Sequence, residues 1–277
     1  MIQRMYLVIL ADGRTRQRPP TGGELPVAFQ QAEDGRTGLE RTVERLAPLI
    51  DALDVVVVTD RRHGQTVRSL VPNALVLAEP IHRNTAASVT LATVAVERPG
   101  DEPMLVVIAD HAIADDDAFR AAVSTMAESL TATETPGGFA APLVAFSVTP
   151  TDADPGWSYI RPRYGDAFRA GALRGFPVDG YEAHPTAPRA RELFDSGTTY
   201  WSAGIFLWRR ADIHAAIERY TPLLTLIEPA HRSELALAAA YDRIQPLSID
   251  ETVLAGAAGD GAVVAIPLDV GWEPSGE

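Results

Sequence analysis

The sequence predicts an α/β protein, a three-layer α/β/α sandwich around a mixed, mostly parallel central sheet. Apolar runs of strand length at residues 5–10, 54–59 and 104–109 alternate with segments of helical spacing. Uninterrupted apolar strands that alternate with helices are typical of sheets covered on both faces. The 277 residues, 46% of them hydrophobic, can bury one large core. We therefore expect a single domain over residues 1–277.

The expected elements follow one another regularly as far as residue 150. Strands are predicted at residues 5–10, 54–59, 74–77, 104–109 and 142–148, and helices at 39–53, 65–71, 86–96 and 118–130. Asn84 or Thr85 can cap the helix at 86–96. The later part is mixed, with strands at 157–161, 176–182, 203–208 and 262–267 and helices at 188–196, 211–220, 233–243 and 249–255.

The composition excludes several classes of function. A net charge of −13 argues against a nucleic-acid partner. The chain has no cysteine and no lysine, so disulfides, thiolate chemistry, cysteine-bound zinc and any lysine-dependent mechanism are closed to it. The apolar runs are shorter than the roughly 18–20 residues of a membrane span, and Met1 is not followed by a signal-peptide pattern. We expect a cytoplasmic protein without a membrane partner.

Two loops at the carboxyl ends of strands are candidates for ligand binding. The loop at 11–26 contains glycines, arginines and a threonine, a composition that suits a phosphate but also an ordinary surface loop. Asp110 directly follows a buried strand, where a carboxylate can hold Mg²⁺. The acidic residues Asp115, Asp116 and Asp117 are better explained as the cap and dipole partners of the following helix.

A third group of polar residues surrounds the expected start of the helix at 86–96. Glu79, Arg83, Asn84 and Thr85 could bind a polar base or a sugar, although helix capping and an ion pair are the favoured explanation on the residues alone. Trp201 is expected to pack in the core, with a place in a pocket as the alternative. The six histidines show no paired metal-ligand spacing.

Taken in order, the motifs of this chain resemble those of the mannose-1-phosphate guanylyltransferase family. Residues 8–16 (VILADGRTR) are similar to the opening VILAGGSGTR with one residue deleted, and 37–46 (TGLERTVERL) to SLLQxTxxRL. Further matches are EP at 79–80, RNTA at 83–86, ADH at 109–111, GWSYI at 156–160, YWSAGIF at 200–206, SID at 248–250 and GW at 271–272.

The resemblance implies a GT-A-like nucleotidyltransferase fold, with residues 1–150 as a nucleotide-binding half and 151–277 as a sugar-binding half. It also implies that the C-terminal β-helix or cupin-like extension of many relatives is absent. The catalytic positions would be Arg16, Asp110 and His184. Nucleotide and substrate contacts are expected from Ala11, Gly13, Thr15, Glu79, Arg83, Asn84, Thr85, Tyr159, Trp201 and Gly204.

Several positions depart from the family pattern. Val27 and His184 stand where the resemblance places lysines, and Asp12 stands in place of a glycine of the phosphate loop. Pro274 replaces the second metal-binding aspartate, so Mg²⁺ would depend on Asp110 alone. Ser202 and Ala203 replace the Asn and Ser of the WNSG motif.

Nucleotidyl transfer depends on positioning and charge neutralisation, and the loss of one cation costs a factor of about 10²–10⁴ in rate. The sequence therefore favours a divergent guanylyltransferase-like protein whose cleft is repurposed, for example in secondary metabolism, or has lost normal transfer. One alternative is an active sugar-1-phosphate nucleotidyltransferase that makes an NDP-sugar. Another is a non-catalytic regulatory or scaffolding paralogue. Expected partners are a nucleotide, a sugar phosphate or a related polar metabolite, and a second copy or a partner enzyme.

Overall fold

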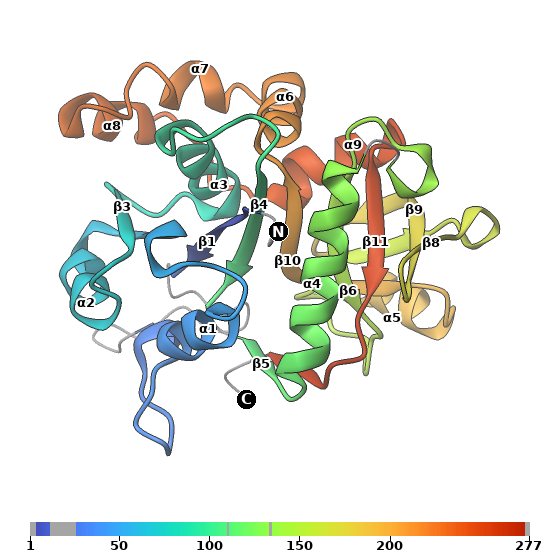
Figure 1. Ribbon diagram of the computed structural model, residues 1–277. Coiled ribbons are helices and arrows are strands. Elements are labelled where there is room, and N and C mark those ends of the chain that lie inside the picture. Colours follow the sequence, from blue (N-terminus) through green and yellow to red (C-terminus); the bar gives the residue numbers. More distant parts are fainter. Residues whose placement is uncertain (1–3, 12–25, 110, 133–134, 275–277) are drawn as a thin grey trace.

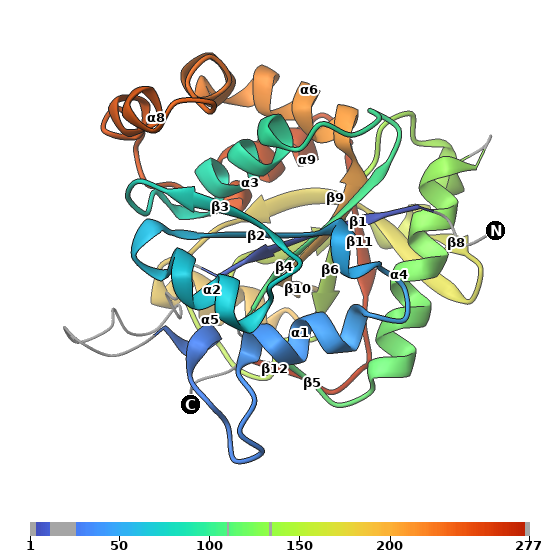
Figure 2. The ribbon, with the colours of Figure 1, turned by 60° about the vertical axis from the view of Figure 1, so that its left-hand side comes forward.

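The computed structural model describes residues 4–11, 26–109, 111–132 and 135–274. Ten strands form one mixed sheet in the order β3-β2-β1-β4-β10-β6-β11-β9-β7, with β8 beside β9 (Figure 1). Helices lie on both faces of this sheet (Figure 2). The predicted α/β sandwich is therefore confirmed. Among the described helices, none combines the length and the apolar character that a bilayer span requires.

Four parallel strands form one side of the sheet. They are β1 (Tyr6–Leu10), β2 (Val55–Asp60), β3 (Leu75–Glu79) and β4 (Pro103–Ile108). β1 lies between β2 and β4, and the backbone N–H of Ala109 donates to the carbonyl of Leu10 at 3.1 Å. The carboxyl ends of these strands, and the loops that leave them, consequently lie at one edge.

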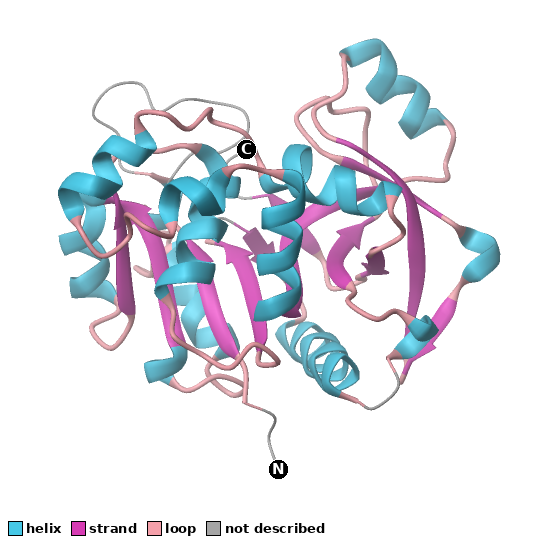
Figure 3. Cartoon of the chain, turned by 90° about the horizontal axis from the view of Figure 1, so that it is seen from above, coloured by secondary structure: helices cyan, strands magenta, loops and turns pink. Residues whose placement is uncertain are grey.

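The remaining strands continue from β10 (Tyr200–Arg209), which is antiparallel to β4 and to β6 (Leu143–Val148). Beyond β6 lie β11 (Val263–Pro267), β9 (Leu173–Glu182) and β7 (Tyr159–Pro162), while β8 (Phe168–Ala170) pairs with β9. β7 also pairs with the start of β10, so β10, β6, β11, β9 and β7 form a closed circuit of pairings. Figure 3 shows this part of the sheet curving away from the parallel strands.

Two helical layers enclose the sheet, each over its own apolar core. The first core lies beneath α1 (Gly38–Leu46), α2 (Gly64–Leu70), α4 (Asp116–Thr131) and α5 (Ala187–Asp195). The second core lies beneath α3 (Asn84–Ala95), α6 (Arg210–Tyr220), α7 (Leu223–Ile227), α8 (Glu234–Tyr241) and α9 (Ala255–Gly259). Side chains alternate between the two cores along each strand, because successive residues of a strand point to opposite faces.

The beginnings of α1 and α4 show why these helices start where they do. Thr37 and Glu40 form a capping box, in which the Thr37 N–H donates to Glu40 Oε2 at 2.8 Å and the Glu40 N–H donates to Thr37 Oγ1 at 3.2 Å. Asp115 Oδ1 accepts the N–H of Ala118 at 2.9 Å, and Asp116 forms an ion pair with Arg45. The structural interpretation of this acidic run is confirmed.

Some elements differ from the expectation. The helix predicted at 39–53 ends at Leu46, because Pro48 has no N–H with which to continue the helix; a short 3-10 turn, Ala52–Asp54, follows. The helix predicted from 249 begins as a π-helix, Asp250–Leu254, that runs into α9. The prediction missed α7 and the ribbon of β5 (His111–Ile113) and β12 (Trp272–Pro274), whose strands have three residues each and are too short for a clear pattern.

Gly38 allows the start of α1 to approach the end of β4 closely. A Cβ atom at this position would lie 2.5 Å from the carbonyl oxygen of Ala109. No real Cβ comes so near a backbone oxygen, so any larger residue would push α1 away from the segment that leads to Asp110. The absence of a side chain at Gly38 therefore sets the distance between this helix and the edge of the sheet.

Gly38→Ala is expected to destabilise the fold by about 1–3 kcal/mol in urea unfolding, the usual cost of overpacking. Gly64→Ala is the matched control, since Gly64 also begins a helix but its Cβ would meet only the end of the Arg68 side chain, at 3.3 Å. This control should be neutral or slightly stabilising, because alanine favours a helix more than glycine does. Equal stability of the two variants would contradict the steric role of Gly38.

Candidate functional site

The phosphate-loop candidates begin at the carboxyl end of β1. Gly13, Thr15 and Arg16 lie outside the described residues, as do Asp12 and Asp110. Ala11 is buried; its N–H donates to Val58 at 2.9 Å, and its carbonyl accepts the hydroxyl of Thr59 at 2.8 Å. Both backbone groups of Ala11 thus fix the point at which the loop leaves the sheet.

The ribbon of β5 and β12 brings the GW motif beside the ADH motif. Its register places Pro274 opposite His111, Glu273 opposite Ala112 and Trp272 opposite Ile113. Pro274 stands where the resemblance places the second metal-binding aspartate, and a proline side chain offers no ligand atom. Among the residues that the structure describes, no three His, Asp or Glu side chains gather as a metal site would require. Pro274 therefore supplies no side-chain ligand to a two-carboxylate Mg²⁺ site.

Gly204 places β10 close to Ile108 and His111, at the end of β4 and the start of β5. It lies in an irregularity of β10 between Ser202 and Ile205, with φ of +68°, a conformation that glycine adopts without strain. A Cβ at Gly204 would lie 2.8 Å from Ile108 Cδ1 and 3.1 Å from His111 Nε2. The structure therefore brings the YWSAGIF and ADH motifs together, with a glycine in a left-handed conformation at their contact.

Tyr159 and Trp201 belong to an aromatic cluster that also contains Trp157 and Trp272. Trp157 stacks on Trp201 with ring centroids 5.4 Å apart, and Trp272 meets Trp157 edge-on at 5.0 Å. Tyr159 lies edge-on to Trp201 at 6.2 Å. Tyr159 and Trp201 are 0% and 3% exposed, so they pack as core residues and present no open ring face to a ligand. Their expected substrate contacts would require this packing to change.

Glu79 and Arg83 are engaged by a segment far along the chain, residues 241–251, which we call the bracing segment. Glu79 is fully buried; its Oε1 accepts the hydroxyl of Tyr241 at 2.9 Å and its Oε2 accepts that of Ser88 at 3.0 Å. Arg83 Nε donates to the carbonyl of Tyr241 at 2.8 Å. Burial and the neighbouring Glu79 raise the pKa of Tyr241 well above its ordinary value. Both carboxylate oxygens of Glu79 thus accept hydrogen bonds within the core, and its expected ligand contact stays a prediction.

Asn84 and Thr85 play different parts at the start of α3. Asn84 has φ of +66°, a left-handed conformation that asparagine tolerates, and its Oδ1 accepts the N–H of Thr85 at 2.7 Å. Thr85 Oγ1 accepts the N–H of Ile249 at 2.9 Å, and no side chain caps α3, so the expectation that Asn84 or Thr85 caps this helix is wrong. The N–H of Ala86 donates to Leu247 at 3.3 Å. The bracing segment therefore holds the RNTA turn at several points.

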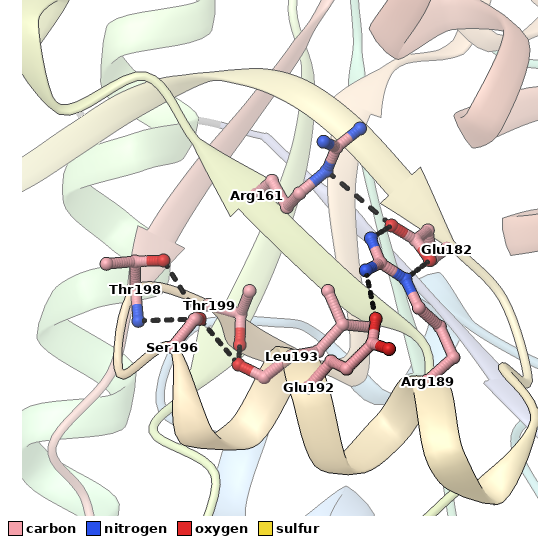
Figure 4. Close-up of polar contacts among 8 residues, drawn as sticks. All are labelled: Arg161, Glu182, Arg189, Glu192, Leu193, Ser196, Thr198 and Thr199. Carbon is pink, nitrogen blue, oxygen red and sulfur yellow. Dashed lines mark hydrogen bonds and ion pairs between the residues drawn. The ribbon is translucent and has the colours of Figure 1, made fainter.

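His184 lies on an exposed turn after β9. Its φ is +45°, and its Nδ1 is 3.1 Å from the carbonyl oxygen of Gly156, which connects the turn to the loop before β7. The guanidinium of Arg189 donates two hydrogen bonds to Glu182, from Nε to Oε2 at 2.8 Å and from Nη2 to Oε1 at 2.7 Å. Its Nη1 donates a third hydrogen bond to Glu192 (Figure 4). Arg161 Nε lies 3.7 Å from Glu182. The hydrogen bonds from Arg189 hold the pKa of Glu182 below its usual range.

Three polar residues of this region, Tyr241, Asp250 and Ser202, were not predicted as site residues. Tyr241, at the end of α8, carried no motif signal. Asp250 and Ser202 lie within the SID and YWSAGIF motifs, and the pattern gave no sign that their side chains meet, which they do with a hydrogen bond of 3.1 Å. The contact joins residues 48 positions apart, so only the folded chain reveals it.

Tyr241→Phe is expected to lower the free energy of unfolding by about 1.5–3 kcal/mol, because it removes a hydrogen bond to a buried carboxylate. Amide hydrogen exchange across residues 79–86 should become faster, since the bracing contact of Glu79 is lost. Tyr220→Phe is the control, because Tyr220 also donates to a carboxylate, Asp260, but at the surface. Unchanged exchange at 79–86 in Tyr241→Phe would show that the bracing segment does not hold this turn.

Glu182→Gln tests the electrostatic role of the Arg189 contacts. A carboxylate whose pKa is depressed in the folded state stabilises that state above its unfolded pKa, about 4.3 for glutamate, and loses this contribution as the pH falls through the folded value. The variant should therefore melt at a lower temperature than the parent at pH 7, with the difference shrinking towards pH 3. Glu192→Gln, more exposed, should show a smaller effect. A difference independent of pH would contradict this assignment.

Comparison with known proteins agrees with this geometry. No family model matches the chain. The mannose-1-phosphate guanylyltransferase of Escherichia coli K12 is 29% identical over 294 residues, which cover 99% of this chain and 58% of the relative. The alginate biosynthesis protein of Pseudomonas aeruginosa is 27% identical, covering 98% and 56%. The chain thus spans somewhat more than half the length of these curated relatives.

Solved structures show the same fold. A structure from Thermus thermophilus, described as a mannose-1-phosphate geranyltransferase, has a TM-score of 0.79 and 28% identity, and the match covers 98% of this chain and 76% of that one. A mannose-6-phosphate isomerase structure from Helicobacter pylori matches with a TM-score of 0.76 and 19% identity, covering 98% and 99%. The resemblance found in the motifs is confirmed: the chain is similar over nearly its whole length to mannose-1-phosphate guanylyltransferases, and it shares the fold of these solved structures.

Proposed function

We propose that this protein is a divergent guanylyltransferase-like protein whose ligand site no longer performs ordinary nucleotidyl transfer. The register of β5 and β12 is the observation that carries this proposal. It puts Pro274 opposite His111, so the position that would complete a pair of carboxylates with Asp110 has no side-chain ligand atom. With one carboxylate, the remaining ligands of Mg²⁺ would have to come from water and bound phosphate, so the protein itself would anchor the ion more weakly.

The loss of positive charge supports the same proposal. The chain has no lysine, and Val27, at the start of a 3-10 turn, and His184 occupy the positions that resemble the lysines of the family. Phosphoryl centres are stabilised in transfer almost entirely by fixed positive charge and positioning. The arginines of the loop at 11–26 could neutralise a bound phosphate, but they do not replace a metal site.

The intact fold favours a site that still binds a ligand. The RNTA turn is held by the bracing segment, and Gly204 still fits against β4. We infer that residues 1–150 form a nucleotide-binding half and residues 151–277 a sugar-binding half. The ligand we propose is a nucleotide, a sugar phosphate or a related polar metabolite, handled as the substrate of another reaction or as a regulatory signal.

The decisive assay is the release of pyrophosphate from GTP and mannose 1-phosphate with Mg²⁺. We expect the purified chain to be slower than the E. coli relative by a factor of at least about 10⁴, the combined cost of a lost cation and a lost metal ligand. The double variant Val27→Lys/Pro274→Asp should recover measurable magnesium-dependent turnover. Rapid turnover by the unmodified chain would overturn the proposal and favour an active sugar-1-phosphate nucleotidyltransferase.

A thermal-shift screen with nucleotides and sugar phosphates then separates the remaining cases. A ligand that binds the folded protein raises its melting temperature, whether or not it reacts. A clear shift without turnover would support a repurposed or regulatory site. The absence of any shift would contradict the retained ligand site and favour a scaffolding role.

A further inference from the structure

The mixed sheet has an open margin at β3, which we call the β3 edge. β3 stands at one end of the strand order, and among the described strands it pairs only with β2 (Figure 1). The other end of the order is closed, because β7 pairs both with β9 and with β10. There the outlying strand is β8, which has three residues. The longest open border of the described sheet is therefore β3.

The backbone of β3 can accept a further strand. A strand that is paired on one side directs alternate N–H and C=O groups to the other side. No hydrogen bond from the described part of the chain outside β2 reaches the backbone of residues 75–78. Edges of this kind are usually protected by a charged side chain, a proline or a bulge. Residues 75–78 (LVLA) contain neither a charge nor a proline, and their register with β2 is unbroken.

Exposed apolar side chains gather at the β3 edge. Leu53, in the turn before β2, is 75% exposed, Leu75, the first residue of β3, is 47% exposed, and Ile81, two residues beyond the end of β3, is 43% exposed. Because Leu75 pairs with Val56, Leu53 lies at the same end of the edge as Leu75. These are three of the six large apolar side chains that are exposed in the described part of the chain. Apolar side chains around an open strand indicate a site of association.

The two ends of the β3 edge carry opposite charges. At the amino end of β2, Asp51 is exposed and forms no ion pair with a described residue. At the carboxyl end, Arg61 and Arg62 directly follow β2 and are exposed. The guanidinium of Arg68 lies there too, since a Cβ on Gly64, the first residue of α2, would be 3.3 Å from Arg68 Nη1. Of these arginines only Arg62 forms an ion pair within the described chain, so this end has excess positive charge.

We propose that the β3 edge binds a second copy of the chain, by antiparallel pairing of the two β3 strands about a twofold axis at Leu77. Residues opposite one another on paired strands point to the same face, so a twofold axis through the pair must pass at a residue, and Leu77 is the central residue of β3. In this arrangement Val76 lies opposite Ala78 of the partner subunit. The two sheets then form one continuous sheet.

The antiparallel orientation matches the apolar side chains and the charges of the β3 edge. It sets the amino end of one β3 beside the carboxyl end of the other, so Leu53 and Leu75 lie at the end that carries Ile81 of the partner subunit. The acidic end of each copy likewise lies beside the basic end of the other. A parallel alignment would bring like charges together, so the charge pattern favours the antiparallel one. This inference is independent of the proposed function.

Sedimentation equilibrium of the purified chain at micromolar concentrations tests the association. We expect the mass to approach twice the 29.7 kDa of one chain as the concentration rises. Leu75→Lys and Ile81→Lys should each raise the dissociation constant of the dimer by at least about tenfold, because pairing would bury an ammonium group. Both side chains are exposed, so neither variant should fail to fold. Leu235→Lys, at an 84% exposed leucine of α8, is the matched control and should keep the dimer.

Disulfide cross-linking tests the orientation, since the chain has no cysteine of its own. Leu77→Cys places two sulfurs across the axis, where opposite Cα atoms are about 4.5–5.5 Å apart and suit a disulfide. Its oxidation should give a cross-linked dimer much faster than that of Leu235→Cys. A parent that stays monomeric, or a dimer that Leu75→Lys and Ile81→Lys leave unchanged, would overturn the proposal. Equal rates of cross-linking at the two cysteines would overturn the antiparallel pairing.

Discussion

Strand β10 is the element on which the arrangement of the molecule depends. It pairs with β4 on one side and with β6 on the other, and its first residues also pair with β7. The parallel strands that carry the phosphate-loop candidates are thereby joined to the curved remainder of the sheet through a single strand. Its irregularity at Gly204 admits the end of β4 and His111, so the geometry of the candidate site is set by backbone pairing.

The bracing segment forms a second connection across the same junction. At one end Tyr241 holds Glu79 and Arg83, and at the other Asp250 holds Ser202. Both buried carboxylates accept hydrogen bonds from hydroxyls, while arginines such as Arg163 and Arg189 form ion pairs with exposed or partly exposed acids. Surface pairs of this kind add little stability each, so we attribute the integrity of the site region mainly to buried hydrogen bonds and packing.

Much of the fold could be predicted because its signals are local. The apolar runs of β1, β2 and β4 and the capping of α4 by Asp115 follow from residues close in sequence. The resemblance also assigned residues of the ADH and YWSAGIF motifs to one site, and the structure places Gly204 beside His111. The sequence could not show that Glu79 turns into the core, or that Asp250 meets Ser202, because these contacts join distant residues. The ribbon of β5 and β12 was not predicted, because each strand has only three residues and is defined by its pairing with a segment far away in the sequence.

The proposed function depends on the loss of a metal anchor, because Pro274 lies opposite His111 where a second carboxylate would be needed. Titration of the purified protein with Mn²⁺, followed by electron paramagnetic resonance of the free ion, measures this property directly. We expect no saturable binding at micromolar Mn²⁺ and the appearance of one site in Pro274→Asp. Stoichiometric micromolar binding by the unmodified chain would contradict the claim.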